Sequence, residues 1–349
     1  MNTEQADRNY FHDLELLVVQ MEEAKRLVTI DTVPHLRLAL ILLDNVVELS
    51  MQRMATQIFY LEQPVANMAD NFRRGLKHPG ADLTEEQVQA IREQISDMEQ
   101  RFTSKTRRKK VLGSFGGKVD FLIEKGKLPS EIKPVLHKLH GYRNETYHRD
   151  QHRREILAPA AMVYFDSACD MFGIFRPIVA GTSSDIGPEL KKFIEEDVRH
   201  FNPAYFDLPE KIAETLRAEI GLDTHKVAEA LSEHLLARIE TFIEELEYAN
   251  GFMDEEGDVL RYVQRQREDL SFFANPKEFH KRSFPVTYET IAGWRTAAAE
   301  VRSMQDKHEL LSKYGLIEDE FEPLETAVQN VVANIERSID IQIDAALGK

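Results

Sequence analysis

Residues 36–51, LRLALILLDNVVELSM, determine the fold class of this chain. Their apolar side chains recur at intervals of three and four, which is the spacing of one helical face. Asp31 or Thr32 can cap the start of such a helix, and Pro34 suits its first turn, where a missing N–H costs nothing. Because the stretch is apolar on most faces, we expect a central helix that runs to about Glu62. The spacing is defined by Leu36, Leu40, Leu43, Val47 and Met51.

The same spacing continues along the chain and predicts further helices. A basic helix is expected from Lys105, loosened by three glycines between residues 113 and 117, and another helix follows Pro129. Gly141 is expected to bend or restart that helix just ahead of Arg143. No run alternates convincingly enough to predict a strand, so the predicted fold class is all-α. The remaining N-terminal helices are expected over residues 4–28, 83–102 and 159–175.

A change of composition marks the predicted domain boundary. Residues 177–184, PIVAGTSS, are small, uncharged and turn-prone. They predict an N-terminal helical bundle over residues 1–177 and an acidic C-terminal helical region of unassigned role over residues 185–349. A length of 349 residues suits two such domains. Within the first, the polar helix at 83–102 has the character of an insertion.

The composition is that of a folded globular protein, with 42% hydrophobic and 30% charged residues. The one cysteine, Cys169, lies among apolar residues and has no partner for an internal disulfide, which favours a reducing cytosol. Residues 2–13 are too polar for a secretory signal. The most apolar run, residues 36–43, is far shorter than a membrane span. We therefore expect a cytoplasmic protein that does not enter a membrane.

Charge is distributed unevenly along the chain. The net charge is −16, yet residues 101–155 contain fifteen Lys and Arg against six Asp and Glu, a local charge of about +9. The remainder then carries about −25. Such segregation predicts one basic working surface on an acidic body, so the negative net charge does not argue against a nucleic acid as the partner.

The centre of the basic region holds the sequence RNETYH, residues 143–148. On a helix, Asn144 and His148 share a face, while Arg143 must reach across with its long side chain. A histidine titrates near neutrality and suits general acid–base catalysis, whereas arginine holds phosphate oxygens through parallel donors. RNA carries its own nucleophile, the 2'-hydroxyl, so this set can cleave it without a metal. Alternatively, Arg143 and His148 line a solvated helix face or pair with Glu145 and Asp150.

The pattern Arg143-Asn144-x-x-x-His148 resembles the signature of the HEPN superfamily of helical ribonucleases and toxins. The resemblance covers about residues 1–177 and includes an early helix of the type found at residues 39–48, ALILLDNVVE. It implies a bundle of four or five helices with the motif near the start of a late helix. This chain is more than twice as long as one such domain.

The resemblance implies an endoribonuclease that leaves a 2',3'-cyclic phosphate and needs no cofactor. It also implies a homodimer in which Arg143 and His148 of both copies face one cleft. Family members commonly act as toxins or antiviral effectors. From the charge segregation, the acidic C-terminal region is expected to shield the basic cleft or to bind a regulatory protein. The hypothesis from another class is a non-catalytic helical module that dimerises or recruits a partner in a defence or regulatory complex.

Further residues are candidates for contact with RNA. The basic block and Arg149 can bind phosphates, although such a run is equally typical of a solvated face. Tyr147 can stack on a base, as can Tyr142, or either can pack in the core. Glu48 is a candidate to position Arg143 and is otherwise a surface carboxylate. The basic block comprises Lys105, Arg107, Arg108, Lys109 and Lys110.

Other motifs are weaker. The histidines at 137, 140 and 152 do not form a recognisable metal-ligand set with carboxylates or thiols. Residues 212–235 superficially resemble a helix-turn-helix, but the second helix has the wrong charge for DNA, and a packed helical hairpin is the better interpretation. The acidic residues 254–258 lack the alternation of a calcium loop and predict a turn.

Overall fold

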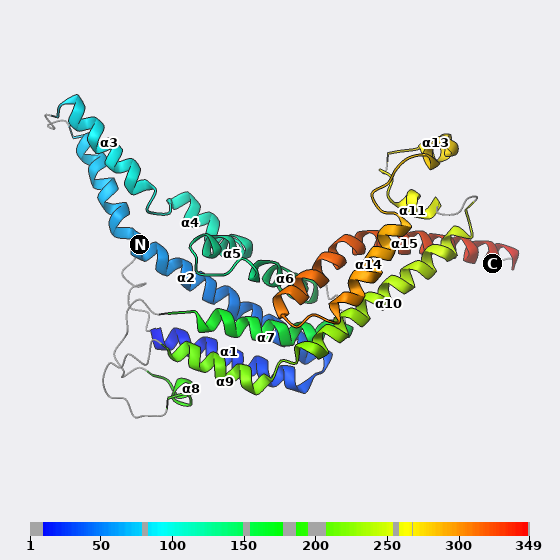
Figure 1. Ribbon diagram of the computed structural model, residues 1–349, viewed down its shortest axis with the longest axis horizontal. Coiled ribbons are helices and arrows are strands. Elements are labelled where there is room, and N and C mark those ends of the chain that lie inside the picture. Colours follow the sequence, from blue (N-terminus) through cyan, green and yellow to red (C-terminus); the bar gives the residue numbers. More distant parts are fainter. Residues whose placement is uncertain are drawn as a thin grey trace. The chain divides into compact units, whose positions relative to one another are not determined.

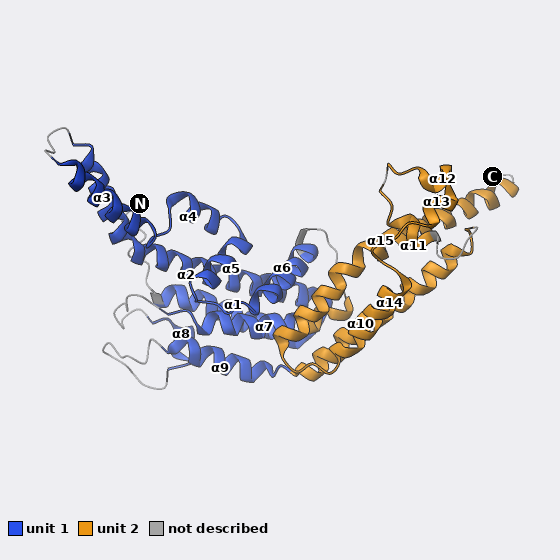
Figure 2. Cartoon of the chain, turned by 45° about the horizontal axis from the view of Figure 1, so that its top comes forward, with its two compact units in different colours: residues 1–152, 160–222 blue, residues 153–159, 223–349 orange. Residues whose placement is uncertain are grey.

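The computed structural model describes residues 10–78, 83–148, 154–176, 186–194, 207–253, 258–266 and 268–347. Every regular element among them is a helix, so the predicted all-α class is confirmed (Figure 1). The chain forms two compact units (Figure 2). Unit 1 comprises residues 1–152 and 160–222, and unit 2 comprises residues 153–159 and 223–349. None of the helices in the described ranges has the length and apolar composition that a membrane crossing requires.

Unit 1 is built on two long helices that pack against each other, α1 (Tyr10–Ile30) and α2 (Val33–Leu76). Only two residues join them, and Asp31 adopts a left-handed backbone with φ of 52°. Short polar residues tolerate this region better than branched ones, because their side chains bond locally. The apolar stripes of both helices are fully buried, including Leu14, Leu17 and Met21 of α1.

Helix α2 is longer than predicted, since it continues past Glu62 to Leu76 with Pro64 inside it. Proline removes one helical hydrogen bond, which usually ends or kinks a helix. The prediction stopped early because beyond Glu62 the described part of α2 buries only one residue, Ala69. Helix α3 (Glu85–Glu99) packs along this outer half, and its start has the capping box that Thr84 forms with Gln87.

Helices α4 to α7 come next along the chain. The glycine-rich stretch separates α4 (Lys105–Leu112) from α5 (Phe115–Glu124), and serines 104 and 114 cap their first turns. Next come α6 (Ile132–His148), a short 3-10 turn η2 (Arg154–Ile156) assigned to unit 2, and α7 (Leu157–Gly173). Helices α5 and α6 both pack against α2. The core-facing side chains of α6 include Leu136 and Leu139, which are fully buried.

Gly141 does not restart the helix as one alternative predicted, because α6 runs through it without interruption. A glycine costs a helix about 1 kcal/mol relative to alanine, which is less than the packing of α6 contributes. Residues 143–148 therefore lie in the last turns of α6. The expectation that they fall near the start of a helix is also wrong.

The division between the units falls after Leu222, later than the predicted boundary. Residues 177–184 themselves lie outside the described residues. Helices α8 (Pro188–Lys191) and α9 (Leu208–Ile220) both pack on α1. Arg217 of α9 donates through Nε to Asp166 Oδ1 of α7 at 2.7 Å. A turn-prone stretch indicates a connection between helices, but it does not say whether the helices on its two sides share a core.

Unit 2 centres on α10 (Thr224–Asn250), α14 (Tyr288–Val301) and α15 (Lys307–Ala346), which pack together. Arg238 lies in their core and pairs with Glu318 at 2.7 Å and with Glu325. Residues 212–235, for which a packed helical hairpin is predicted, span the division between the units: α9 belongs to unit 1 and α10 to unit 2. The acidic residues 254–257 lie outside the described part of the chain. Three short helices complete the unit: α11 (Asp258–Val263), α12 (Ser271–Ala274) and α13 (Pro276–His280).

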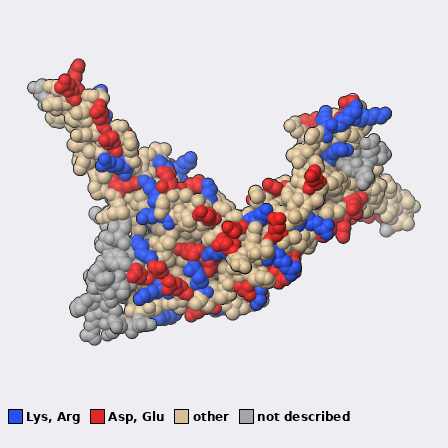
Figure 3. Space-filling model, in the orientation of Figure 1, with Lys and Arg blue, Asp and Glu red and all other residues tan. Residues whose placement is uncertain are grey.

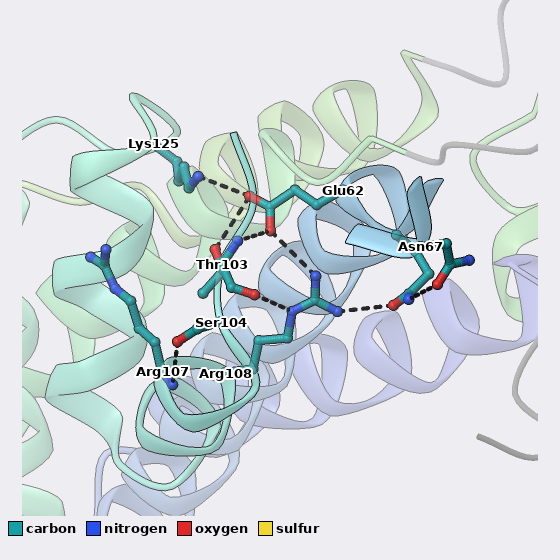
Figure 4. A network of polar contacts seen from close by, with 8 residues as sticks. Glu62, Asn67, Thr103, Ser104, Arg107, Arg108 and Lys125 are labelled. Carbon is teal, nitrogen blue, oxygen red and sulfur yellow. Dashed lines mark hydrogen bonds and ion pairs between the residues drawn. The ribbon is translucent and has the colours of Figure 1, made fainter. Parts of the chain in front are cut away.

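A carboxylate of α2, Glu62, joins four segments of unit 1 (Figure 4). It accepts hydrogen bonds from the backbone N–H of Thr103 at 2.7 Å and from Lys125 Nζ at 2.9 Å. Arg108 of α4 lies 3.6 Å from the same carboxylate and donates through Nε to the carbonyl of Thr103 at 2.8 Å. Burial alone would raise the pKa of Glu62, but the hydrogen bonds from Lys125 and Thr103 outweigh it and hold the pKa below 4.5.

Replacing Glu62 by Gln is expected to reduce the pH dependence of stability. A carboxyl whose pKa is lowered by folding stabilises the protein above its unfolded pKa, and this contribution is lost as pH falls through the folded pKa. The difference in unfolding free energy between wild type and Glu62→Gln should therefore be largest near pH 6 and narrow below about pH 4.5. Glu124→Gln, which changes an exposed carboxylate paired with Arg107, serves as the control. A difference that is constant with pH would contradict the assignment.

Candidate functional site

The candidate site is organised by a buried carboxylate, Asp44, in the middle of α2. Its side chain is fully buried, and an unpaired charge in such a place would be strongly destabilising. Three described side chains converge on it from α6 and α7. Tyr164 donates its hydroxyl to Oδ1 at 2.5 Å, and His140 Nδ1 contacts the same oxygen at 2.7 Å. Arg143 Nε lies 3.3 Å from Oδ2. Asp44 therefore holds α6 and α7 against α2.

Arg143 is oriented on both sides. Its Nε faces Asp44, and its Nη1 donates to Asn144 Oδ1 at 2.9 Å. The Arg143 side chain remains 22% exposed. The last turn of α6 is fastened separately, because Arg37 of α2 donates through Nη2 to the carbonyl of Thr146 at 2.9 Å. A cation at the C-terminal end of a helix also interacts favourably with the negative end of the helix dipole. The guanidinium of Arg143 is thus preorganised.

The other residues of the motif are only partly described. Tyr147 and His148 occupy the last two positions of α6, but their side chains lie outside the described residues, as does all of Arg149. The helical backbone places Asn144 and His148 one turn apart on one face. The convergence of Arg143 and His148 on one substrate stays a prediction.

His140 and Tyr164 were not identified from the sequence as site residues. Burial, together with the adjacent charge and hydrogen bond of Asp44, raises the pKa of the Tyr164 hydroxyl well above its ordinary value of 10.0, so it remains a neutral donor. The ring of His140 stacks on Phe115 of α5, with centroids 4.0 Å apart and an angle of 12° between planes. The available signal was Asp44 itself, a charged residue directly after the apolar run of residues 38–43.

Glu48 does not pair with Arg143, so the prediction that it positions this arginine is wrong. Its Oε1 accepts from Lys118 Nζ of α5 at 2.9 Å, and the Lys118 side chain is only 2% exposed. The carboxylate beside Arg143 is Asp44, one helical turn earlier in α2. Both carboxylates lie on the face of α2 toward α5 and α6. The helical period alone therefore does not show which of them pairs with Arg143.

The basic block separates into exposed and structural residues. Lys105, Lys109 and Lys110 are exposed, and no described carboxylate pairs with them. Arg107 pairs with Glu124, and Arg108 belongs to the Glu62 network, so it is a poor candidate for RNA contact. On the face in Figure 3, cations and carboxylates are interspersed. The charge segregation along the sequence is therefore reduced by folding, because two carboxylates of α2, Glu48 and Glu62, pair with cations of the basic segment.

Two further expectations concern Tyr142 and the histidines. Tyr142 is 5% exposed with Lys138 Nζ 5.5 Å from its ring centre, so it packs in the core and is no stacking surface for a base. His152 lies outside the described residues. Within the described ranges, no three His, Cys, Asp or Glu side chains are grouped to hold a metal ion.

Comparison with protein-family models, with curated proteins and with solved structures found no match to this chain. The chemistry of the site is therefore inferred from its own residues. These residues are a guanidinium and an imidazole on one buried carboxylate, an adjacent carboxamide, and a histidine one turn further along α6.

Replacing Asp44 by Ala is expected to destabilise the protein by about 3–5 kcal/mol, because His140 and Tyr164 lose their hydrogen-bond partner and Arg143 loses its ion-pair partner. The free energy of unfolding in denaturant measures this. The matched control is Asp120→Ala, which removes an exposed carboxylate paired with Lys133 and should cost less than about 1 kcal/mol. Equal costs for the two variants would show that Asp44 is not the organising group.

Proposed function

We propose that this chain is a metal-independent endoribonuclease of the HEPN type. It would cleave RNA by attack of the 2'-hydroxyl on the adjacent phosphorus and leave a 2',3'-cyclic phosphate. The observation that supports this most is the anchoring of Arg143, in the pattern Arg143-Asn144-x-x-x-His148, on the buried carboxylate of Asp44. An arginine fixed in this way has a defined direction before any substrate binds.

The chemistry follows from what the transition state requires. Negative charge develops on the phosphate oxygens as the 2'-oxygen approaches phosphorus, and a preorganised guanidinium stabilises that charge without reorganising. Arg143 supplies it. One proton must leave the 2'-oxygen and another must reach the departing 5'-oxygen, which is work for a histidine near neutral pH. His148 is assigned to one of these two proton transfers, and Asn144 orients Arg143 through its side-chain oxygen.

RNA binding is assigned to exposed cations of α4. Lys105, Lys109 and Lys110 are open to solvent on a helix that packs on α5, and α5 in turn packs on α6. A strand of RNA whose phosphates lie along α4 would therefore continue toward the end of α6. Arg149, which follows α6, is assigned to the same phosphate-binding set. Phosphate contacts of this kind make the affinity strongly dependent on salt.

The wider role is proposed from the family resemblance. The enzyme would act in the cytoplasm as a toxin or antiviral effector, as a homodimer whose two copies of Arg143 and His148 share one cleft. Unit 2 would bind a regulatory protein. The competing proposal is a non-catalytic helical module that dimerises within a defence or regulatory complex. RNA left intact in the presence of chelator would favour this second role.

His148→Ala is expected to lower RNA cleavage at least about 100-fold, the usual contribution of a general acid or base. The assay incubates purified full-length protein with mixed RNA in chelator and counts cyclic-phosphate ends. Helical circular dichroism and the mass of the particle should be unchanged. The control is His225→Ala, which removes an exposed imidazole of unit 2 and should cleave like wild type. Equal cleavage by wild type and His148→Ala would exclude the assignment.

Replacing Lys105, Lys109 and Lys110 together by Ala is expected to weaken RNA binding and its salt dependence. Each lost phosphate contact lowers the slope of log affinity against log salt by roughly 0.7 for single strands, so the slope should fall by about 2. Binding is measured in the His148→Ala background to prevent cleavage. The control triple variant changes exposed lysines elsewhere and should leave the slope unaltered: Lys77, Lys211 and Lys277. An unchanged slope in the α4 variant would remove this helix from the RNA path.

A further inference from the structure

His140 is held at the same carboxylate as Arg143, although it lies outside the six-residue motif. Its Nδ1 is 2.7 Å from Asp44 Oδ1, while Arg143 Nε is 3.3 Å from Asp44 Oδ2. The imidazole and the guanidinium therefore lie side by side, each on one oxygen of a single carboxylate. The His140 side chain remains 23% exposed. Among the described residues, its Nε2 has no hydrogen-bond partner.

The position of Asp44 defines the protonation of this ring. Because a carboxylate accepts hydrogen bonds, the neutral imidazole carries its proton on Nδ1 and its lone pair on Nε2. Asp44 thereby holds the ring in one tautomer and one orientation, as the aspartate does in a catalytic triad. Stacking on Phe115 fixes the plane of the ring. These features are those of an oriented general base.

The helical register places His140 appropriately. His140, Asn144 and His148 follow one another at intervals of four on α6, so a histidine stands one turn to either side of Asn144. Cleavage of RNA without a metal requires both a base for the 2'-oxygen and an acid for the 5'-oxygen. His140 and His148 lie two turns apart on one face of α6, so the two histidines of one protomer can divide these tasks.

We propose that His140, oriented by Asp44, is the general base of the reaction, a role that rests on the proposed ribonuclease function. The 2'-hydroxyl proton passes to His140 Nε2 as the bond from the 2'-oxygen to phosphorus forms. The bond from phosphorus to the 5'-oxygen breaks, and His148, protonated, gives its proton to that oxygen. The products are a 2',3'-cyclic phosphate and a free 5'-hydroxyl. Each histidine ends in the protonation state in which the other began.

His140→Asn separates this chemical role from a structural one. The amide nitrogen of Asn takes the place of Nδ1 and keeps the donor to Asp44, but the variant lacks the atom corresponding to Nε2. Cleavage of RNA is expected to fall at least about 100-fold while the melting temperature and helical circular dichroism stay near those of wild type. His137→Ala, which removes an exposed histidine one turn earlier on α6, should leave cleavage within about threefold of wild type.

A substrate with sulfur in place of the bridging 5'-oxygen distinguishes base from acid. A thiolate leaves without a proton, so this substrate should restore cleavage by His148→Ala and fail to restore cleavage by His140→Asn. If His140→Asn folds poorly, His140→Ala with added imidazole replaces it, and recovery of cleavage with imidazole is the expected result. Restored cleavage of the sulfur substrate by His140→Asn, or no recovery of His140→Ala with imidazole, would overturn the assignment.

The outcomes separate this inference from the proposed function. Wild-type cleavage together with undiminished cleavage by His140→Asn would overturn the role of His140 and leave the ribonuclease assignment standing. Wild-type protein that leaves all RNA intact in chelator would overturn both.

Discussion

The pairing of Asp44 with side chains of two other helices is the interaction on which unit 1 depends. A carboxylate in the middle of an apolar helix is tolerable only when cationic and hydroxyl donors surround it. His140 and Arg143 come from α6, and Tyr164 comes from α7. The same constraint therefore sets the rotation of α6 on α2 and the direction of the Arg143 guanidinium. Stability and the proposed chemistry share one group.

Much of the architecture follows from patterns that the sequence makes visible. The spacing of Leu36, Leu40 and Leu43 predicts the central helix, and the start of α3 follows from Thr84 and the acidic residues after it. The end of α2 was not predictable in this way, because residues 63–76 rely on α3 for cover and carry little amphipathic signal of their own. The predicted restart of α6 at Gly141 failed for a different reason. The preference of glycine against a helix is weak, and the packing of α6 outweighs it.

The site was predictable at the level of residue types and not of partners. Arg143 and Asn144 stand out because their chemistry suits phosphate and because they are adjacent. Which carboxylate meets Arg143 depends on the rotation of α2, and Glu48 and Asp44 differ by only one turn. Likewise, the basic residues at 107 and 108 are indistinguishable in sequence from their neighbours. Only the fold commits Arg108 to Glu62 and leaves Lys109 in solvent.

Pro64 divides α2, one continuous helix, into two parts that differ in local stability. Proline has no N–H, so the carbonyl of Tyr60 lacks its helical donor. Glu62, midway between Tyr60 and Pro64, anchors α2 at this point through its hydrogen bond with Thr103. Amide hydrogens should therefore exchange slowly through the turns around Asp44 and faster beyond Pro64, where little is buried. Local unfolding of α3 and of the part of α2 beyond Pro64 would then stop at the Glu62 network. The turns of α2 around Asp44, which orient Arg143, would stay helical.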